Sequence, residues 1–217
     1  LLFSFPMPII LALLLNEIRV KWFKRVTQTL LYLPHFLSWV VIGATAYAMF
    51  ATNSGVINTL IANAGKSPIP FLQEDAWWLF SYILIGIWQT MGWGTIIYLA
   101  AITNVNSELY EAAKVDGANR WQQCLHVTLP CIRSTIVVML IMQLGKLMGG
   151  SFERIVALSN AKATEYTSTI TVLVFKWFQG NKFSESTALG LFQSVIGVIL
   201  VVASDKIAKK LGEDGLL

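Results

Sequence analysis

The stretch EAAKVDGANRWQQCLHVTLP, residues 111–130, is the longest polar, helix-forming interruption in a chain that is otherwise strongly apolar. Its first three residues are good helix formers. Gly117 allows a sharp backbone turn that a residue with a Cβ would hinder, and Pro130 suits the first turn of a following helix, where its missing N–H is no loss. We therefore expect a helix, a glycine turn, a second short helix and then a new apolar helix. Such a segment forms a rigid polar projection at the end of an apolar bundle.

This stretch resembles the EAA loop of ABC-importer permease subunits, whose pattern is Glu-Ala-Ala, three residues, Gly, nine residues, an aliphatic residue, one residue and Leu-Pro. The fixed positions of that pattern are filled by Glu111, Ala112, Ala113, Gly117, Val127, Leu129 and Pro130. Three further segments are similar to the maltose-type carbohydrate permeases, in particular to the branch that imports larger oligosaccharides: Leu109-Tyr110 before the motif, Trp121-Gln122-Gln123 within it and Tyr32-Leu33-Pro34-His35-Phe36 upstream. The resemblance covers nearly the whole chain.

The resemblance implies an all-α membrane protein, a polytopic helix bundle of the type I ABC importer transmembrane domain. Residues 1–217 would be one permease domain and residues 104–130 its cytoplasmic coupling loop. It also implies a non-catalytic transport subunit in the bacterial plasma membrane that moves oligosaccharides by alternating access. The residues that would couple it to an ATPase are Glu111, Ala112, Ala113, Asp116, Gly117, Leu129 and Pro130.

The partners that the resemblance implies are a second homologous permease subunit, two cytoplasmic ATP-binding subunits, an extracellular solute-binding protein and the lipid bilayer. A heterodimer of two different permeases is expected. ATP and Mg²⁺ would be bound by the partner ATPase, so that this chain itself needs no cofactor.

The composition excludes an ordinary soluble domain. The chain is 55% hydrophobic and only 13% charged, whereas soluble domains have about 25% charged residues. The apolar residues lie in long runs, which is typical of a protein that crosses a bilayer several times. The formal charge of +4 comes without a basic run with interleaved aromatic residues, so nucleic acid is not an expected partner.

Five apolar runs are the expected membrane spans: residues 1–15, 30–50, 79–102, 132–147 and 186–203. The first run reaches only about 22 Å as a helix, which is short of a hydrocarbon core of about 30 Å, and we expect it to be N-terminally incomplete. The short segment 16–28 is the loop richest in Lys and Arg, which places it in the cytoplasm. Three lysines after the last span place the C-terminus on the same side: Lys206, Lys209 and Lys210.

The loops 51–76 and 152–185 are then expected on the outer side. In the first, Val56, Ile57, Leu60 and Ile61 recur with helical spacing, which indicates a short helix lying on the membrane surface. In the second, the apolar run 170–178 is too short to span the bilayer and is expected to form an interfacial helix.

Candidate substrate contacts lie on the third and fourth spans and just beyond them: Trp88, Gln89, Trp93, Gln143, Phe152 and Glu153. Sugars bind through flat aromatic faces and amide hydrogen bonds, and Gln89 and Trp93 share a helix face because they are four residues apart. The alternative is core packing by the tryptophans and an inter-helix hydrogen bond by the glutamine. Glu153 has two alternatives as well, since its carboxylate can accept sugar hydroxyls or pair with Arg154.

The chemistry of most enzymes is missing from the sequence. It contains no GxxxxGK[ST] phosphate loop and no HExxH motif, and charged residues lie almost only at the ends of the expected spans. An ion-coupled carrier usually places charges near the middle of the membrane, so the energy for transport is expected from a partner. The other hypotheses are an ABC permease for a different small solute, a secondary carrier or channel, and a membrane scaffold.

Overall fold

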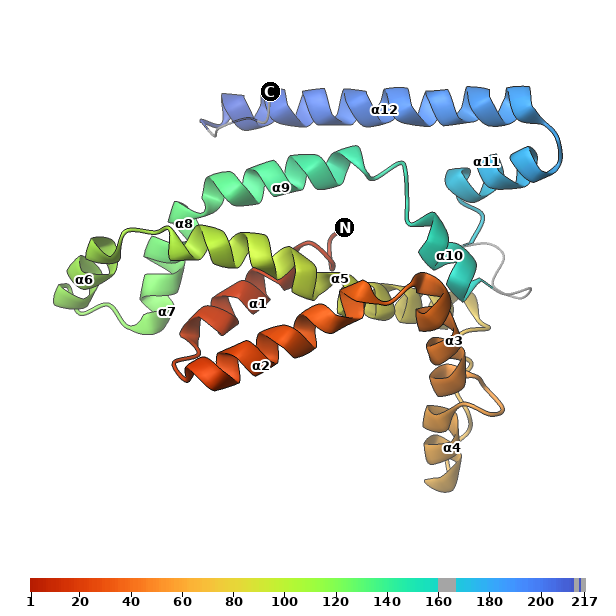
Figure 1. Cartoon of the computed structure of the whole chain (residues 1–217), viewed down its shortest axis with the longest axis horizontal. Coiled ribbons are helices and arrows are strands. Elements are labelled where there is room, and N and C mark those ends of the chain that lie inside the picture. Colours follow the sequence, from red (N-terminus) through yellow and green to blue (C-terminus); the bar gives the residue numbers. More distant parts are fainter. Residues whose placement is uncertain (160–166, 213–214, 216–217) are drawn as a thin grey trace. The chain divides into compact units, whose positions relative to one another are not determined.

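The computed structural model describes residues 1–159, 167–212 and 215, and within these residues all regular secondary structure is helical (Figure 1). The all-α prediction is confirmed. The helices are α1 (Pro6–Glu17), α2 (Lys21–Tyr32), η1 (Leu33–Phe36), α3 (Trp39–Phe50), α4 (Val56–Asn63), α5 (Asp75–Thr103), α6 (Ser107–Val115), α7 (Arg120–Gln123), η2 (Cys124–Thr128), α8 (Leu129–Cys131), α9 (Arg133–Gly145), α10 (Phe152–Leu158), α11 (Ile170–Gln179) and α12 (Phe183–Lys210).

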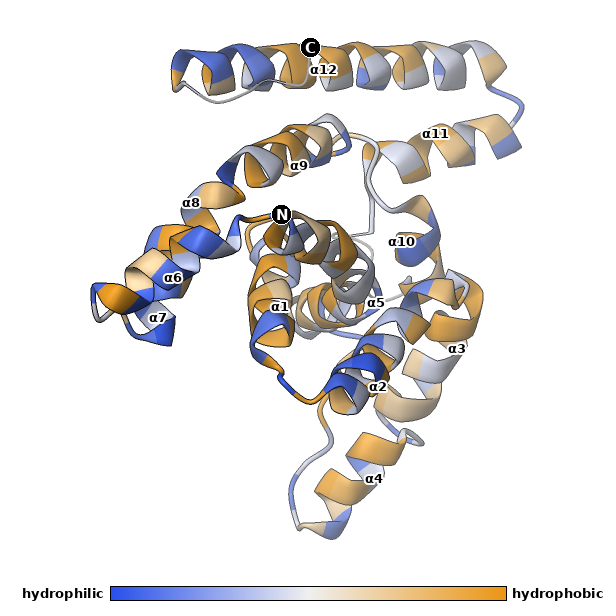
Figure 2. Cartoon of the chain, turned by 60° about the vertical axis from the view of Figure 1, so that its left-hand side comes forward, coloured by the Kyte–Doolittle hydropathy of each residue, from blue (hydrophilic) through white to orange (hydrophobic). Residues whose placement is uncertain are grey.

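Two of these helices are long and apolar enough to cross a bilayer as single rods. They are α5, with 29 residues, and α12, with 28 residues, against the roughly 20 residues that a hydrocarbon core requires. They contain the expected third and fifth spans. Figure 2 shows hydrophilic residues gathered at the C-terminal end of α12, where Lys209 and Lys210 lie in its last turn. Cations in this position also complement the partial negative charge of the helix end.

The expected span 30–50 is interrupted in the structure, where the helical segments Lys21–Phe36 and Trp39–Phe50 meet at an angle of 103°. The α-helix α2 gives way to the 3₁₀-helix η1, and the chain leaves helical conformation before α3 begins at Trp39. Pro34 lies in η1, where its ring and missing N–H work against a continuing α-helix. Ser38 then caps α3, its hydroxyl accepting a hydrogen bond from the backbone N–H of Val41 at 3.4 Å. Much of the basic segment 16–28 is correspondingly helical rather than a loop.

The expected fourth span, 132–147, coincides with helix α9 and begins at a bend. The helical run Arg120–Cys131 meets α9 at an angle of 61°. Between α7 and α8 lies η2, a π-helix of five residues, which is a wider turn than the α-helical one. Pro130 lies in the first turn of the short helix α8, which is where it was expected. The number of membrane crossings and the side on which the C-terminus lies stay predictions.

Contacts divide the chain into two compact units, each discontinuous in sequence. Unit 1 comprises Leu1–His35, Gln89–Gly145 and Ile199–Leu217, and unit 2 comprises Phe36–Trp88 and Lys146–Val198. Each has its own buried apolar cluster, which in unit 1 contains Ala12, Tyr98, Ile102 and Ile132 and in unit 2 contains Ile42, Ala46, Trp78, Ile85 and Leu158. A single permease domain over residues 1–217 stays a prediction.

The short helices expected in the loops 51–76 and 152–185 are present as α4 and α11. The loop that contains α4 is fixed by Asn58, a buried polar residue with 2% exposure. Its amide donates to the carbonyls of Ala51 and Ile69 at 3.1 and 2.8 Å, and accepts from the N–H of Ile69 at 2.7 Å. Part of the second outer loop, residues 160–166, lies outside the described residues.

Candidate functional site

The segment after α5 forms a helical hairpin closed by a glycine turn (Figure 1). Asn106 caps α6 by accepting a hydrogen bond from the backbone N–H of Glu108 at 3.0 Å. Beyond the helix, Gly117 has a φ of +79°, a conformation that side chains with a Cβ rarely adopt. Its N–H donates to Lys114 O at 3.0 Å, and the N–H of Ala118 donates to Ala113 O at 2.8 Å. This pair of bonds is the Schellman motif, so the expected glycine turn is confirmed.

The second arm of the hairpin starts with an equally well-formed cap. Asn119 and Gln122 exchange side chain-to-backbone hydrogen bonds at 2.8 and 2.9 Å, which makes a capping box at the start of α7. The hydroxyls of Tyr110 on α6 and Thr128 on η2 lie 3.0 Å apart and join the two arms. Both arms are therefore held in a defined geometry by their own residues.

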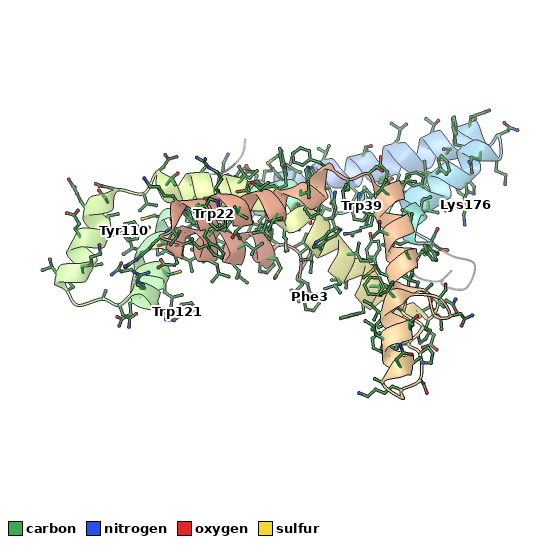
Figure 3. All side chains as sticks on the ribbon, turned by 60° about the horizontal axis from the view of Figure 1, so that its bottom comes forward. Phe3, Trp22, Trp39, Tyr110, Trp121 and Lys176 are labelled. Carbon is green, nitrogen blue, oxygen red and sulfur yellow. The ribbon has the colours of Figure 1, made fainter. Side chains whose placement is uncertain are left out.

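The hairpin exposes most of the residues that the sequence assigns to coupling. Glu111, Ala112, Asp116, Gly117 and Pro130 are exposed, and no residue of α6 is buried. Large apolar side chains are exposed beside them, with Val115 88% and Trp121 70% accessible; Figure 3 shows Tyr110 and Trp121 on this hairpin. Leu129 differs, because it packs against the buried cluster of unit 1. The hairpin thus offers a rigid mixed surface on an anchored base.

One ion pair joins the hairpin to the rest of unit 1. Nη1 of Arg120 lies 2.7 Å from Oε2 of Glu17 at the end of α1, and about half of each side chain is exposed. The two residues are 103 positions apart in the sequence. Sequence analysis did not single out either of them, because no local pattern links them.

Two of the proposed substrate contacts come together on α5 with a histidine from η1. The Trp93 indole stacks on the His35 ring with centroids 4.7 Å apart and 9° between the planes. The Gln89 amide donates to the carbonyl of His35 at 3.4 Å and is 6% exposed, whereas Trp93 is 47% exposed. Gln89 thus donates an inter-helix hydrogen bond, which was the alternative to its role as a sugar contact. Trp93 keeps an accessible aromatic surface.

The other candidates are not part of this group. Gln143 is exposed on α9, and Trp88 is 43% exposed at the end of the α5 segment that belongs to unit 2. Phe152 packs on Phe175 with ring centroids 4.7 Å apart, and Glu153 is exposed. Among the described residues the recorded ion pairs join Glu17 with Arg120 and Asp205 with Lys209, so the alternative pairing of Glu153 with Arg154 is not seen.

Arg154 instead turns onto aromatic rings that sequence analysis had not connected with it. Its guanidinium carbon lies 3.8 Å from the centroid of Tyr82 and 5.7 Å from that of Trp39. These three residues come from α10, α5 and α3, and only the fold brings them together. In the sequence Arg154 follows Glu153 near the start of helix 152–158, and no local pattern connects the arginine with either ring.

In residues 1–159, 167–212 and 215, no group of three His, Cys, Asp or Glu side chains is close enough to hold a metal ion.

Apolar helices together with an exposed polar hairpin are the features of a membrane permease subunit. The chain belongs to the family described as "Binding-protein-dependent transport system inner membrane component", whose pattern matches residues 4–211. It is accordingly a non-catalytic inner-membrane component of an ABC transporter, with the type I importer fold.

Several of the similar proteins are named as permeases for sugars. The chain is 46% identical over 213 residues to the polygalacturonan/rhamnogalacturonan transport system permease protein YteP of Bacillus subtilis, covering 98% of this chain and 66% of YteP. It is 42% identical over 217 residues to Protein LplB of the same organism, covering 100% of this chain and 68% of LplB. The chain thus spans about two thirds of the length of these relatives.

Among solved structures, the chain is similar to a chain of the bacterial alginate ABC transporter in complex with an alginate pentasaccharide-bound periplasmic protein. The TM-score is 0.95 at 36% identity, over 99% of this chain and 75% of the other.

Proposed function

We propose that this chain is a permease subunit of an ATP-driven importer that moves oligosaccharides across the bacterial plasma membrane by alternating access. The observation that carries the proposal is the hairpin of α6 and α7: a capped, glycine-closed, exposed projection at the end of an apolar helix, in a chain of the binding-protein-dependent permease family. Because the chain offers no phosphate loop of its own, a partner has to supply the energy.

Coupling runs through the hairpin. Helix α6 docks in a groove of a cytoplasmic ATPase, a helix-in-groove contact in which Ala112 and Ala113 allow close approach and Glu111 pairs with a basic group of the partner. When ATP and Mg²⁺ close the ATPase dimer, the docked hairpins move together and the bundle changes from inward- to outward-facing. ATP shifts this equilibrium only as far as its binding differs between the two states.

The base of the hairpin transmits the motion. Leu129 packs against the cluster that contains Tyr98 and Ile102 of α5, so a force on the hairpin reaches the core of unit 1 directly. Asp116 and Gly117 form the exposed tip. Pro130 lies next to Leu129 in α8 and helps to fix the direction in which this base leaves the hairpin.

The substrate class follows from the relatives. YteP is named for polygalacturonan and rhamnogalacturonan, and AraP of Bacillus subtilis, 27% identical over 215 residues, is named for arabinooligosaccharides. Trp93 offers an accessible aromatic face of the kind that sugars stack on. Trp88, Gln143, Phe152 and Glu153 are further pathway candidates, and Gln89 bonds the backbone of His35, whose ring stacks on Trp93.

The working transporter contains a second homologous permease, two ATPase subunits and an extracellular solute-binding protein. A second candidate function is import of another small solute by the same machinery. One relative favours it: GgtC of Synechocystis, 32% identical over 141 residues, is named an osmoprotective compounds uptake permease.

The experiment that tests the proposal is uptake by the complete transporter, co-expressed with its partner subunits and reconstituted in proteoliposomes with its binding protein. Uptake of labelled oligosaccharides should require ATP on the ATPase side, and the ATPase should co-purify with this chain. Uptake driven by an ion gradient without ATP would support a secondary carrier instead, and ATP-dependent uptake restricted to small non-sugar solutes would support the second candidate.

A further inference from the structure

Helix α2 is covered along only one of its sides by the rest of unit 1. None of its residues is fully buried, and its large apolar side chains Trp22, Phe23 and Leu30 are 73%, 52% and 64% exposed. Figure 3 labels Trp22 on this helix. In an inner-membrane protein, exposed apolar side chains meet lipid, and tryptophan favours the depth at which headgroups and acyl chains join. One side of α2 therefore packs on protein and the other is open to the bilayer.

The protein side of α2 lies against the C-terminal part of α5, which runs in the opposite direction (Figure 1). A Cβ on Gly92 would collide with the carbonyl group of Leu31, so the two backbones approach closely there. From this crossing, α5 rises about 17 Å to its end at Thr103, and α2 extends back about 15 Å to Lys21. The first turn of α2 therefore reaches the end of α5, a helix of membrane-spanning length.

A groove of about 330 Å³ opens between the two helices. This volume is in the range of sites that hold small organic ligands. The groove is lined from α5 by Ile96, Leu99, Ala100 and Thr103, and from α2 by Gln28 and Tyr32. It thus has one mainly apolar wall and one polar wall, which suits an amphiphilic ligand.

The polar wall continues toward the start of α2 as a row of cations. Lys21, Arg25, Gln28 and Tyr32 follow one another at intervals of four, three and four residues, which puts them on one face of the helix. Lys24 is next to this row and is half-buried, whereas Lys21 and Arg25 are exposed. The groove and the cations are thus parts of one surface, with the positive charges at the end where α5 stops.

The positive charge of this row is not neutralised within the part of the chain that the structure describes. The ion pairs recorded there join Glu17 with Arg120 and Asp205 with Lys209. Glu17, four residues before Lys21, is therefore already engaged, and none of the residues that line the groove is Asp or Glu. The cationic end of the groove favours an anionic ligand, because charge-assisted hydrogen bonds from Lys and Arg are the strong ones.

We propose that the groove between α2 and α5 binds an anionic phospholipid of the surrounding bilayer. Its phosphate pairs with Lys21 and Arg25, and one acyl chain lies along Ile96 and Leu99 of α5. Charge complementarity selects an anionic headgroup, and the apolar wall selects a lipid over a soluble phosphate compound, because only a lipid fills both parts of the surface. This inference concerns the lipid partner and holds whichever solute is transported.

The test is photo-crosslinking on the complete transporter, purified in detergent, and it needs neither ATP nor uptake. A phosphatidylglycerol with a diazirine in one acyl chain is added, and labelled peptides are identified by mass spectrometry. Residues 96–103 should be labelled at least fivefold more by this lipid than by the phosphatidylcholine with the same chains. Lys21→Gln with Arg25→Gln should lower the phosphatidylglycerol labelling at least fivefold, and excess inorganic phosphate should lower it less than twofold.

Lys206→Gln with Lys210→Gln is the matched control, because it removes two exposed cations at the same spacing from the end of α12. It should change the labelling of residues 96–103 less than twofold. Equal labelling by the two lipids, an equal loss in the control, or displacement by inorganic phosphate would overturn the inference. No labelling of the segment by either lipid would also overturn it, because another protein segment would then cover the groove.

A further variant tests the groove apart from the charges. Ala100 is exposed on the wall of the groove, so Ala100→Phe fills the space of the acyl chain and leaves every cation in place. Labelling of residues 21–32 by the phosphatidylglycerol should fall at least threefold, whereas Ala203→Phe, at an exposed alanine of α12, should leave it within twofold of wild type. Unchanged labelling in Ala100→Phe would overturn the assignment of the acyl chain to this groove.

Discussion

The hairpin of α6 and α7 and the cluster of Arg154, Tyr82 and Trp39 use glycine in opposite ways. Gly117 has a positive φ and open space around it, so that its backbone conformation is what a substitution would break. Gly86 is helical and lies against Arg154, so that the missing Cβ is what matters. The hairpin depends on a turn that shapes an exposed surface, and the cluster depends on a space that admits a charge. Two glycines can therefore be required for different physical reasons, one for its backbone conformation and the other for its small size.

The largest expected effect concerns the backbone turn. Gly117→Val puts a β-branched residue at a φ of +79°, which we expect to distort the hairpin and lower uptake per ATP hydrolysed at least tenfold while the subunit still inserts. The control is Gly65→Val, which has a similar φ of +74° and similar open space in the loop after α4. Uptake and ATP hydrolysis are measured on the same proteoliposomes. Normal coupling in Gly117→Val, or equal loss in both variants, would contradict a special role for the hairpin.

A second variant tests the close approach of α5 to α2 inside unit 1. The atoms next to Gly92 belong to the backbone, which cannot move aside as the Arg154 side chain next to Gly86 can. A Cβ on Gly92 would lie 1.9 Å from the carbonyl oxygen of Leu31. We expect Gly92→Ala to destabilise the chain by about 1–3 kcal/mol, because α2 has to shift away from α5. Thermal unfolding in detergent is the measurement, with Gly190→Ala as control, because a Cβ there meets nothing within 4 Å. A melting temperature as high as that of the control would show that the helices can separate without loss.

A third variant removes a polar anchor from unit 2. Asn58→Ala leaves the carbonyl and the N–H of Ile69 without their side-chain partner, which should cost about 1–3 kcal/mol. Limited proteolysis should then cut the loop between α4 and α5 faster than in wild type. Asn63→Ala serves as control, since Asn63 is exposed at the end of α4. Equal cleavage of both variants would argue that the loop is held by other contacts.

The smallest effect is expected from the ion pair at the base of the hairpin. Both side chains of the Glu17 and Arg120 pair are about half exposed, and such pairs contribute only about 0.2–1 kcal/mol. Arg120→Glu should reduce coupling less than twofold at physiological salt, and the exchange of both charges, Glu17→Arg with Arg120→Glu, should restore it. The uptake-to-hydrolysis ratio at low and high salt is the measurement. A loss as large as that of Gly117→Val would make this pair part of the coupling machinery itself.

Sequence patterns predicted those features of the fold that depend on residues close together in the chain. The all-helical class, the glycine turn and the short helices α4 and α11 follow from composition, motif spacing and periodicity, because each involves residues close together in the chain. The interruption between α2 and α3 was missed, since hydropathy stays high across residues 33–50 and does not register that Pro34 and the Ser38 cap favour a new helix there.

Contacts between distant residues were beyond such patterns. Trp93 was singled out as an aromatic contact, but its partner His35 lies on another helix. Trp78 and the carbonyl of Leu158 are 80 positions apart. Arg154 was considered only for an ion pair with its sequence neighbour, whereas the fold gives it two rings from other helices. These sites are set by packing, for which a single sequence contains no local sign.

The π-helix η2 has a consequence for the spacing of the motif. Successive residues of an α-helix are turned by about 100° around its axis, so one residue taken up in a wider turn rotates everything after it by that amount. The wider turn of η2 lets the chain run from the exposed tip of the hairpin and still direct Leu129 toward the buried cluster of unit 1. Shortening the nine-residue interval between Gly117 and Val127 by one position would rotate Leu129 around the helix axis. The leucine would then turn away from the buried cluster of unit 1 and lose its packing contacts.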